Sequence, residues 1–481
     1  MQIVAERPVA DLDAVATKIL VDGAGAFGGS YERMHSPGQE DREELQLLAL
    51  QKRFAQMRNR VPVLKKLADE AGVYEINTLN DIVPLLFKHT VYKSYPISFL
   101  EKNRFTQMNQ WLQKLTTIDL SGVDVSKCQG LDEWVAVLDA ETPLNLRHSS
   151  GTTGTVSFLP RTKGEAEKHY LDSLLGMFQA SGLTAPSRDK PLDMHVIHPN
   201  YRRGTSAPLR TTDLALKYLC GGDETKLHVL YPRAASADLM FLAGRMRAAE
   251  AKGELDRLQL SPALLARRAE FDSMQTSMAD DLKAFLADNI ASLRGEKVYL
   301  RSTWPALYKV AVAGLADGLE GVFSPDSIIG TGGGAKGLEV PPDLEAVLLR
   351  FFGVRRLIYL YGMSEVMGTH MMCDHKRHHI EPWSILFVLD PDTGEILPRT
   401  GVQTGRAAFF DLQAETYWGG FVSGDEISVD WSPCGCGRQS PHIDRKIERY
   451  SEKRGGDDKI TCAASPEAHE SALNYLTDLT G

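Results

Sequence analysis

Residues 149–155 combine side chains and spacing that suit phosphate binding. The run reads Ser-Ser-Gly-Thr-Thr-Gly-Thr and contains no apolar side chain. Glycine lets the backbone turn its N–H groups toward an oxyanion, and the Ser and Thr hydroxyls add further donors. The spacing is not the G-x-x-x-x-G-K-[ST] of a Walker loop. We therefore predict a phosphate-binding loop of another kind, formed by Ser149, Ser150, Gly151, Thr152, Thr153, Gly154 and Thr155.

Further segments carry aromatic or acidic side chains at the ends of predicted strands. In Tyr-Gly-Met-Ser-Glu, Tyr361 can stack on a purine and Glu365 can hold Mg²⁺. In Ser-Gly-Asp, the carboxylate of Asp425 can accept hydrogen bonds from both hydroxyls of a ribose. The glycine-rich run at 331–337 would let a flat ligand lie against the backbone. Taken singly, each of these segments also fits an ordinary turn.

Cysteines and histidines form a candidate metal site. Cys434 and Cys436 are separated by one glycine, and Cys373 lies close to three histidines in the sequence. Three thiolates and one imidazole make the closed tetrahedral set of a structural zinc site. In a cytosolic protein such a grouping favours metal binding over a disulfide. The alternative is a set of unrelated thiols beside a solvated cluster of histidines: His375, His378 and His379.

The elements that position these segments are predicted from hydrophobic spacing. Apolar residues three or four apart predict one or two amphipathic helices over 41–72, and a second helical region covers 235–293. Four short apolar runs predict strands: 194–198, 227–231, 327–330 and 356–361. Strands that alternate with helices predict a mainly parallel α/β sheet. From residue 385 onward, short strands and turns predict a smaller β-rich subdomain, which begins with a strand, turn and strand over 386–395.

Size and composition limit the class of protein. The chain has 481 residues and a formal net charge of −9, which argues against broad binding of nucleic acid or of an anionic membrane. No apolar run approaches the roughly 20 residues of a membrane span, and the N-terminus lacks a secretory signal. We expect a cytoplasmic protein without nucleic-acid or membrane partners; the sequence leaves a homodimer open.

The motifs S-S-G-T-T-G, G-G-G-x-K-G, Y-G-M-S-E, S-G-D and G-G-D-D-K-I, in this order, resemble those of the adenylate-forming superfamily. They are most similar to the branch that holds phenylacetate-CoA ligases and LuxE-type acyl-protein synthetases, over about residues 145–475. The resemblance implies that a small carboxylic acid attacks the α-phosphate of ATP to give an acyl-adenylate and pyrophosphate. The acyl group then passes to CoA, to a carrier or partner protein, or to an amine. The alternative is a binding or scaffold protein that keeps the fold and has lost the second half-reaction.

The resemblance also implies roles for individual residues. Residues 149–155 would hold the phosphates, with Thr152 in the catalytic set, and Lys336 or Arg161 would stabilise the charge that develops at phosphorus. Glu365 would bind Mg²⁺. Gly333 and Gly334 would flank the adenine, Tyr361 would stack on it, and Asp425 would bind the ribose; Gly362 and Ser364 are further residues implied for cofactor binding. At the metal site the resemblance selects His379, so the implied zinc ligands are Cys373, His379, Cys434 and Cys436.

Two departures from the family pattern concern basic residues and the C-terminus. The lysine that often follows T-T-G-x-P is absent, with Arg161 or Lys163 as substitutes. The G-R-x-D-D hinge appears as Arg-Gly-Gly-Asp-Asp at 454–458, and little sequence follows it. The family's C-terminal domain is therefore expected to be very short or truncated.

The predicted organisation has four parts and leaves the acid open. The parts are a helical region (1–140), an ATP-binding α/β core (141–384), a β-rich subdomain with zinc (385–451) and a hinge with a rudimentary C-terminal segment (452–481). The acid would contact residues 198–203 and the strand ends near 302–304. Arg202 or Arg203 either meets an anionic group of the acid or is a solvated surface charge.

Overall fold

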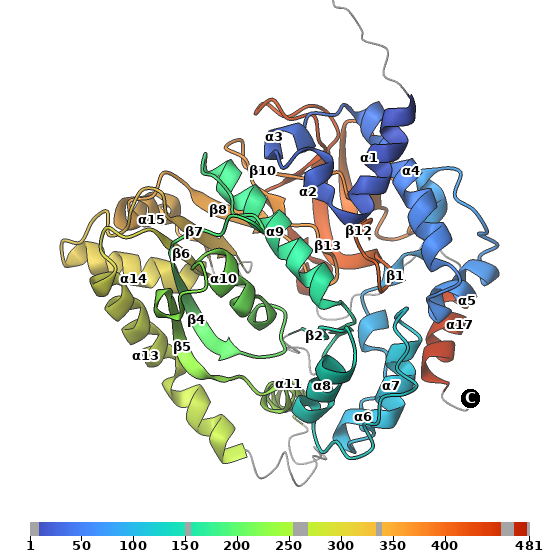
Figure 1. Ribbon diagram of the computed structural model, residues 1–481, viewed down its shortest axis with the longest axis horizontal. Helices are drawn as coiled ribbons and strands as arrows, with labels where there is room; N and C mark the ends of the chain where they lie inside the picture. The colour runs from blue at the N-terminus through green and yellow to red at the C-terminus, as the bar shows by residue number, and fades with distance from the viewer. Residues whose placement is uncertain (1–8, 150–154, 254–267, 333–338, 454–465, 479–481) are drawn as a thin grey trace, which may run out of the picture.

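The protein is described by a computed structural model over residues 9–149, 155–253, 268–332, 339–453 and 466–478. Two sheets organise these residues (Figure 1). One has six strands and is mainly parallel, and the other has seven strands and is mainly antiparallel. The predicted α/β class with a mainly parallel sheet is therefore confirmed.

The parallel sheet has the strand order β5-β4-β6-β7-β8-β9. Its strands are β4 (His195–Arg203), β5 (Leu227–Ala234), β6 (Val298–Thr303), β7 (Ile328–Gly332), β8 (Leu357–Tyr361) and the short antiparallel β9 (His370–Met371). The four strands predicted from apolar runs are confirmed as β4, β5, β7 and β8. The sequence indicated β6 only by its end, although it lies between β4 and β7 at the centre of the sheet.

Alternate residues of the parallel strands pack on opposite faces of the sheet. Leu300 of β6 and Ile329 of β7 belong to a core formed with helices on one face. Tyr299 and Ile328 belong to the larger core on the other face, where Tyr299 contacts Met177 of α9. The helices on the two faces are α13 (Arg268–Ser292), α14 (Trp304–Ala316) and α15 (Leu344–Phe352) on the first, and α9 (Lys163–Ala180) and α10 (Thr212–Tyr218) on the second (Figure 1). Burial of both faces explains why the strands read as continuous apolar runs.

The antiparallel sheet draws strands from two regions of the chain. Its strands are β1 (Phe87–Lys88), β10 (Arg377–His379), β11 (Ser384–Leu389), β12 (Val402–Asp411), β13 (Gly420–Asp430), β14 (His442–Asp444) and β15 (Glu448–Arg449). β1 pairs with β13 in parallel, so the N-terminal region contributes to this sheet. The sheet also includes β10, which precedes the expected start of a β-rich subdomain at residue 385.

Of the strand, turn and strand predicted over 386–395, the first strand and the turn are present. The first strand is β11, and the turn is fixed by Asp390, whose Oδ1 accepts hydrogen bonds from the backbone N–H groups of Asp392 and Thr393 at 2.9 and 2.8 Å. The second strand does not form, because only an isolated bridge joins Leu389 to Ile396. The partner of β11 is β12, which begins at Val402.

The N-terminal region is helical and packs against the antiparallel sheet. Its helices are α1 (Val9–Val21), α2 (Gly23–Ala26), α3 (Tyr31–Met34), α4 (Gln39–Met57), α5 (Pro62–Glu70), α6 (Ser98–Glu101), α7 (Phe105–Gln113) and α8 (Leu131–Glu141), with 3₁₀ turns η1 (Leu79–Leu85) and η2 (Val91–Lys93). The helical structure predicted over 41–72, as one or two helices, is confirmed and consists of two, α4 and α5. Arg53 of α4 donates from Nε to the carbonyl of Leu412 at 3.0 Å, so α4 is tied to the end of β12.

The other predicted helical region, 235–293, contains α11 (Ala237–Lys252) and α13, with residues 254–267 outside the described ranges. Shorter elements complete the middle of the chain: η3 (Leu209–Thr211) and η4 (Glu224–Lys226). No helix in the described ranges combines the length and hydropathy needed to cross a bilayer.

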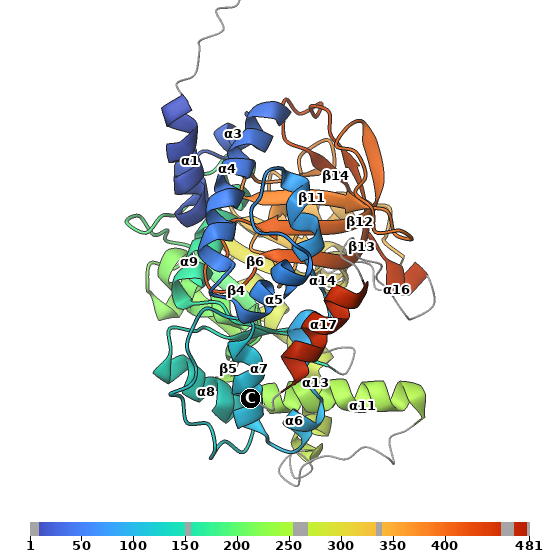
Figure 2. The same cartoon turned by 90° about the vertical axis from the view of Figure 1, so that its right-hand side faces the viewer.

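The described residues of the C-terminal part form two helices, α16 (Tyr450–Lys453) and α17 (Pro466–Thr477). Figures 1 and 2 both place α17 beside α5, and the two helices are in contact. The Lys114 ammonium donates to the carbonyl of Tyr475 at 2.6 Å, and Leu476 is fully buried. These contacts hold α17 against the N-terminal helices.

Candidate functional site

A two-stranded ribbon brackets the predicted phosphate loop. β2 (Arg147–His148) pairs antiparallel with β3 (Phe158–Leu159). Beyond the ribbon, the backbone N–H of Ser149 donates to the carbonyl of Ser157 at 3.0 Å, and the Ser149 hydroxyl accepts from the Ser157 N–H at 3.0 Å. The ribbon thus fixes both ends of the motif, of which Ser149 and Thr155 are described. The other predicted loop residues lie outside the described ranges: Ser150, Gly151, Thr152, Thr153 and Gly154.

The second and third motifs meet at the carboxyl end of the parallel sheet. Tyr361 is the last residue of β8, and its hydroxyl donates to Asp425 Oδ2 at 2.9 Å. Burial raises the pKa of Tyr361 well above its ordinary value, and the Asp425 carboxylate adds to the shift, so the phenol stays protonated and can donate. Asp425 also faces Arg449 of β15, with Arg449 Nε 3.6 Å from Asp425 Oδ1. Gly333, Gly334 and Lys336, which follow β7, lie outside the described residues.

The segment that carries Glu365 is held from both sides. The guanidinium of Arg161 donates from Nη2 to the carbonyl of Ser364 at 2.8 Å. The carboxylate of Asp411 accepts from the backbone N–H of Met367 at 2.6 Å. Both side chains are buried, and Arg161 also donates from Nε to the hydroxyl of Tyr417 at 3.1 Å. Two buried charged groups therefore fix the backbone on either side of Glu365, and Gly362 and Ser364 lie on the same segment.

This geometry changes the expected role of Arg161. Its Nε and Nη2 are engaged with Tyr417 and Ser364, which suits a support for the Glu365 segment better than a phosphate ligand. Lys163, the other substitute proposed from sequence, donates to the carbonyl of Asp139 at 3.3 Å and begins α9. Arg202 is paired with Asp213 and Glu224 at 2.6 and 3.1 Å, which accounts for its charge without a substrate.

Glu365 lies among cations that come from distant parts of the sequence. Burial raises the pKa of its carboxyl group, while Arg161, Lys93 and Arg449 act against that shift. Lys93 ends the 3₁₀ turn η2 in the N-terminal region, where no motif is visible in the sequence. A partly desolvated carboxylate next to several cations can bind a divalent ion together with the anion that this ion accompanies. Lys93 and Arg449 are members of this site that the sequence motifs do not reveal.

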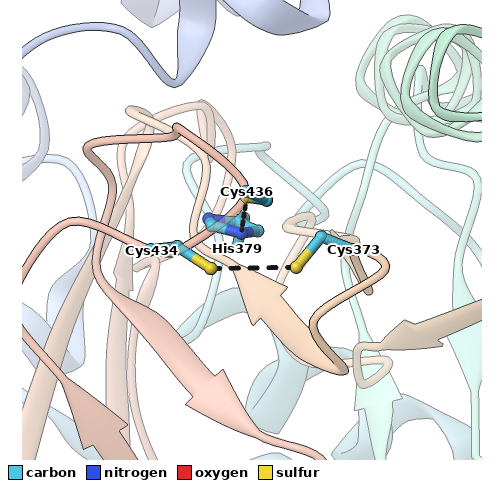
Figure 3. A group of neighbouring side chains, drawn as sticks. All are labelled: Cys373, His379, Cys434 and Cys436. Carbon is cyan, nitrogen blue, oxygen red and sulfur yellow. Dashed lines mark hydrogen bonds between the residues drawn. The ribbon is translucent and has the colours of Figure 1, made fainter.

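The predicted metal ligands come together beside β10, at one edge of the antiparallel sheet (Figure 3). Cys373 follows β9, His379 ends β10, and Cys434 and Cys436 lie in the turn between β13 and β14. The four ligand atoms all lie within 4.8 Å of one another. Cys373 Sγ is 3.9 Å from Cys434 Sγ, and Cys436 Sγ is 3.2 Å from His379 Nε2. A tetrahedral site with metal–sulfur bonds of about 2.3 Å sets its sulfur atoms about 3.8 Å apart, so the donor set fits such a metal.

Two turns with the same hydrogen-bond pattern present the thiols. The N–H of Cys373 donates to the carbonyl of Arg377 at 2.8 Å, and that of Cys434 donates to the carbonyl of Arg438 at 2.9 Å. Each turn has a left-handed residue three positions after the cysteine: Lys376 with φ 59° and Gly437 with φ 93°. Repetition of this geometry on two separate segments favours a shared ligand over two unrelated turns.

The histidines of this region have separate environments. His379 directs Nε2 toward the thiols, and its Nδ1 lies 2.9 Å from the hydroxyl of Ser440. His35 of the N-terminal region contacts the same hydroxyl, also at 2.9 Å. His378 instead places Nδ1 3.0 Å from the carbonyl of His370. His375 packs on Gly435, where a Cβ would lie 2.9 Å from the ring, which explains the glycine between the two cysteines.

Comparisons with known proteins return only weak similarities. No family model matches the chain, and no curated protein matches it. A solved structure of 2-hydroxyisobutyryl-CoA ligase, in an open conformation with 2-HIB-AMP and CoA, is similar over 87% of this chain and 71% of its own, with 13% identity and a TM-score of 0.48. ATP-bound MatB from Rhodopseudomonas palustris is similar over 62% of this chain and 46% of its own, with 13% identity and a TM-score of 0.35. Similarities of this size establish neither a family nor an activity.

Proposed function

We propose that the chain activates a carboxylic acid with ATP as an acyl-adenylate, and then passes the acyl group to a thiol or an amine. The observation that carries the proposal is the hydrogen bond from the hydroxyl of Tyr361 to the carboxylate of Asp425, at 2.9 Å. It joins two motifs that are far apart in the sequence, beside Glu365 and at the carboxyl end of a parallel sheet. Such sheet ends are where ligands bind in open α/β folds.

The proposed reaction needs little covalent chemistry from the protein. A carboxylate oxygen of the acid attacks the α-phosphorus of ATP, and the bond from that phosphorus to the bridging oxygen breaks, so pyrophosphate leaves with the electron pair. The carboxylate is already a nucleophile and requires no strong general base. Catalysis therefore rests on position and on neutralising charge around phosphorus. In a second step the thiol or amine attacks the acyl carbon, and AMP leaves.

Individual residues have distinct roles in this proposal. Tyr361 would stack on the adenine and Asp425 would accept hydrogen bonds from the ribose. The 149–155 motif would donate to the phosphates. Glu365 would hold Mg²⁺, which would offset the charge of the triphosphate. Arg161 and Asp411 would act indirectly, because they fix the backbone on either side of Glu365.

We further propose that Cys373, His379, Cys434 and Cys436 bind zinc. The donor set of three sulfurs and one nitrogen is one that zinc prefers, and four protein ligands leave no open position for catalysis. Zinc would therefore stabilise the fold, where it would connect β10 with the turn after β13.

Release of pyrophosphate tests the proposal directly. The purified chain is incubated with ATP, Mg²⁺ and a panel of carboxylic acids, and pyrophosphate is measured by a coupled assay. We expect release that depends on at least one acid. An absence of release with every acid, together with measurable ATP binding, would support a scaffold protein instead.

Replacing Asp425 by Ala should raise the KM for ATP about tenfold or more. The ribose would lose hydrogen bonds to a charged group, each worth roughly 1.5–3 kcal/mol. Asp430→Ala is a matched control, because Asp430 lies on the same strand and pairs with Ser432 instead. Equal KM values for ATP in wild type and the Asp425 variant would refute the ribose assignment.

Replacing Arg161 by Lys separates a supporting role from phosphate binding. Lysine keeps the charge but cannot reproduce the bonds to Tyr417 and Ser364. We expect the free energy of unfolding to fall by about 2 kcal/mol, from two lost hydrogen bonds. We also expect a lower kcat with little change in the KM for ATP. A stable variant with a raised KM for ATP would show that Arg161 binds phosphate.

A further inference from the structure

A cavity of about 370 Å³ lies between three segments that are distant in the sequence. Thr90, Lys93 and Ser94 come from the N-terminal region, Thr155 ends the phosphate-loop motif, and Asn474 belongs to α17. The cavity is within the usual size of small-molecule sites, roughly 300–1,000 Å³. Helix α17, which lies beside α5 in Figure 2, therefore lines the same cavity as Thr155.

The side chains that line the cavity suit an anion. The lining residues in the described part of the chain include one cation, Lys93, and none is acidic. The side chains of Thr90, Lys93, Thr155 and Asn474 make no hydrogen bond or ion pair with another described residue. They leave an ammonium, two hydroxyls and an amide available as donors. This combination is chemically complementary to phosphate oxygens.

Among the described residues, none forms an ion pair with the Lys93 ammonium. Burial lowers the pKa of its ammonium, while the Glu365 carboxylate acts against that shift and Arg449 adds to it. For Glu365, burial raises the pKa of the carboxyl group, so burial disfavours the charged form of both side chains. A magnesium-bound polyphosphate would relieve both, because phosphate oxygens would face Lys93 and the metal ion would face Glu365.

We propose that this cavity binds the terminal phosphates of the nucleotide and the pyrophosphate that leaves, with Lys93 as the cation and Asn474 of α17 as part of the outer wall. The proposal rests on the proposed function and names the residue that handles the leaving group. As the bond between the α-phosphorus and the bridging oxygen breaks, negative charge accumulates on pyrophosphate. An ammonium at that position stabilises the charge. Lys93 would then stabilise the developing charge, a role for which the sequence analysis named Lys336 or Arg161.

The diphosphate of coenzyme A has the same chemistry and is the other source of such an anion. Two probes distinguish the sources. Sodium tripolyphosphate represents the nucleotide tail without its adenosine, and coenzyme A represents the acceptor. Binding of each to the full chain is measured by titration calorimetry in the presence of Mg²⁺, for wild type and for Lys93→Gln.

Lys93→Gln should weaken tripolyphosphate binding at least about tenfold, and should raise the KM for pyrophosphate in ATP–pyrophosphate exchange by a similar factor. The affinity for AMP should stay within about twofold, since AMP has no terminal phosphates. Lys102→Gln is the control, because Lys102 is exposed in the same region and does not line the cavity. Asn474→Leu should weaken tripolyphosphate binding without changing AMP affinity, which tests the wall formed by α17.

Unchanged tripolyphosphate affinity in Lys93→Gln would overturn the assignment. A variant that loses affinity for coenzyme A but not for tripolyphosphate would also overturn it, and would assign the cavity to the acceptor. The proposed function fails separately, through a wild-type chain that catalyses no exchange with any acid. In that case tripolyphosphate binding still decides whether the cavity is an anion site.

Discussion

Replacing Glu365 by Gln is expected to lower acid-dependent pyrophosphate release at least about 100-fold, which corresponds to about 2.7 kcal/mol of transition-state stabilisation. Gln keeps the size of the side chain but removes the charge that would hold Mg²⁺. The backbone on either side is fixed by Arg161 and Asp411, so the segment should stay in place. Burial raises the pKa of the carboxyl group, and its charged form costs free energy in the folded chain. The thermal midpoint of the variant should therefore equal or exceed that of the wild type.

The pH dependence follows from the same group. A raised pKa means that Glu365 is protonated, and unable to bind Mg²⁺, at pH values where an ordinary glutamate is still charged. Pyrophosphate release by the wild type should therefore fall on the acidic side as pH drops through that raised pKa, and saturating Mg²⁺ should shift the fall to lower pH. Glu395→Gln in the exposed turn after β11 is the matched control and should retain full activity. Wild-type rates in the Glu365 variant would remove Glu365 from the mechanism.

The second large effect is expected at the metal site. The wild-type chain should contain about one zinc ion per molecule, and Cys434→Ser should lose it. Since metal binding is coupled to folding, the free energy of unfolding of the variant should be lower by about 4 kcal/mol or more. Loss of a bound metal is one of the few changes that destabilise a protein by this much. The Cys434 side chain also lies 3.9 Å from that of Cys373, so a shared ion explains the approach of two buried thiols.

Cys128→Ser provides the comparison, because Cys128 is equally buried and lies outside the cluster. It should keep its zinc and nearly all of its stability. A chelator should lower the thermal midpoint of the wild type and of Cys128→Ser, but leave Cys434→Ser unchanged. Freshly purified wild type without any bound metal would contradict the assignment.

Local chemistry explains which parts of the site could be predicted from the sequence. The hydroxyls and glycines of residues 149–155 form one short motif, and Tyr361 and Glu365 lie four residues apart in another. Both motifs can be recognised because all the groups that would contact the ligand lie in a short segment of sequence. The cysteine pair at 434 and 436 is local too, and the structure brings Cys373 and His379 to it. Among the three histidines the ring directed at the thiols is that of His379, whereas sequence spacing alone leaves the choice open.

Contacts between distant segments explain what could not be predicted. Lys93 has no motif around it, and the influence of Glu365 on its pKa depends on how the chain places η2, which contacts β3. β1 joins the antiparallel sheet through pairing with β13, which lies more than 300 residues later in the chain. The strand predicted after the Asp390 turn does not form, because β11 pairs with β12 instead of with the apolar segment that directly follows the turn.

The central claim is that a carboxylate oxygen attacks the α-phosphorus of ATP. It is tested most directly with the acid that gives the largest pyrophosphate release, labelled with ¹⁸O in its carboxylate. The nucleotide products are separated and their mass is measured. The account predicts that AMP carries one ¹⁸O from the acid, because that oxygen bridges the acyl carbon and phosphorus and leaves with AMP. Formation of ADP with ¹⁸O in orthophosphate would contradict it, since the carboxylate would then have attacked the terminal phosphate.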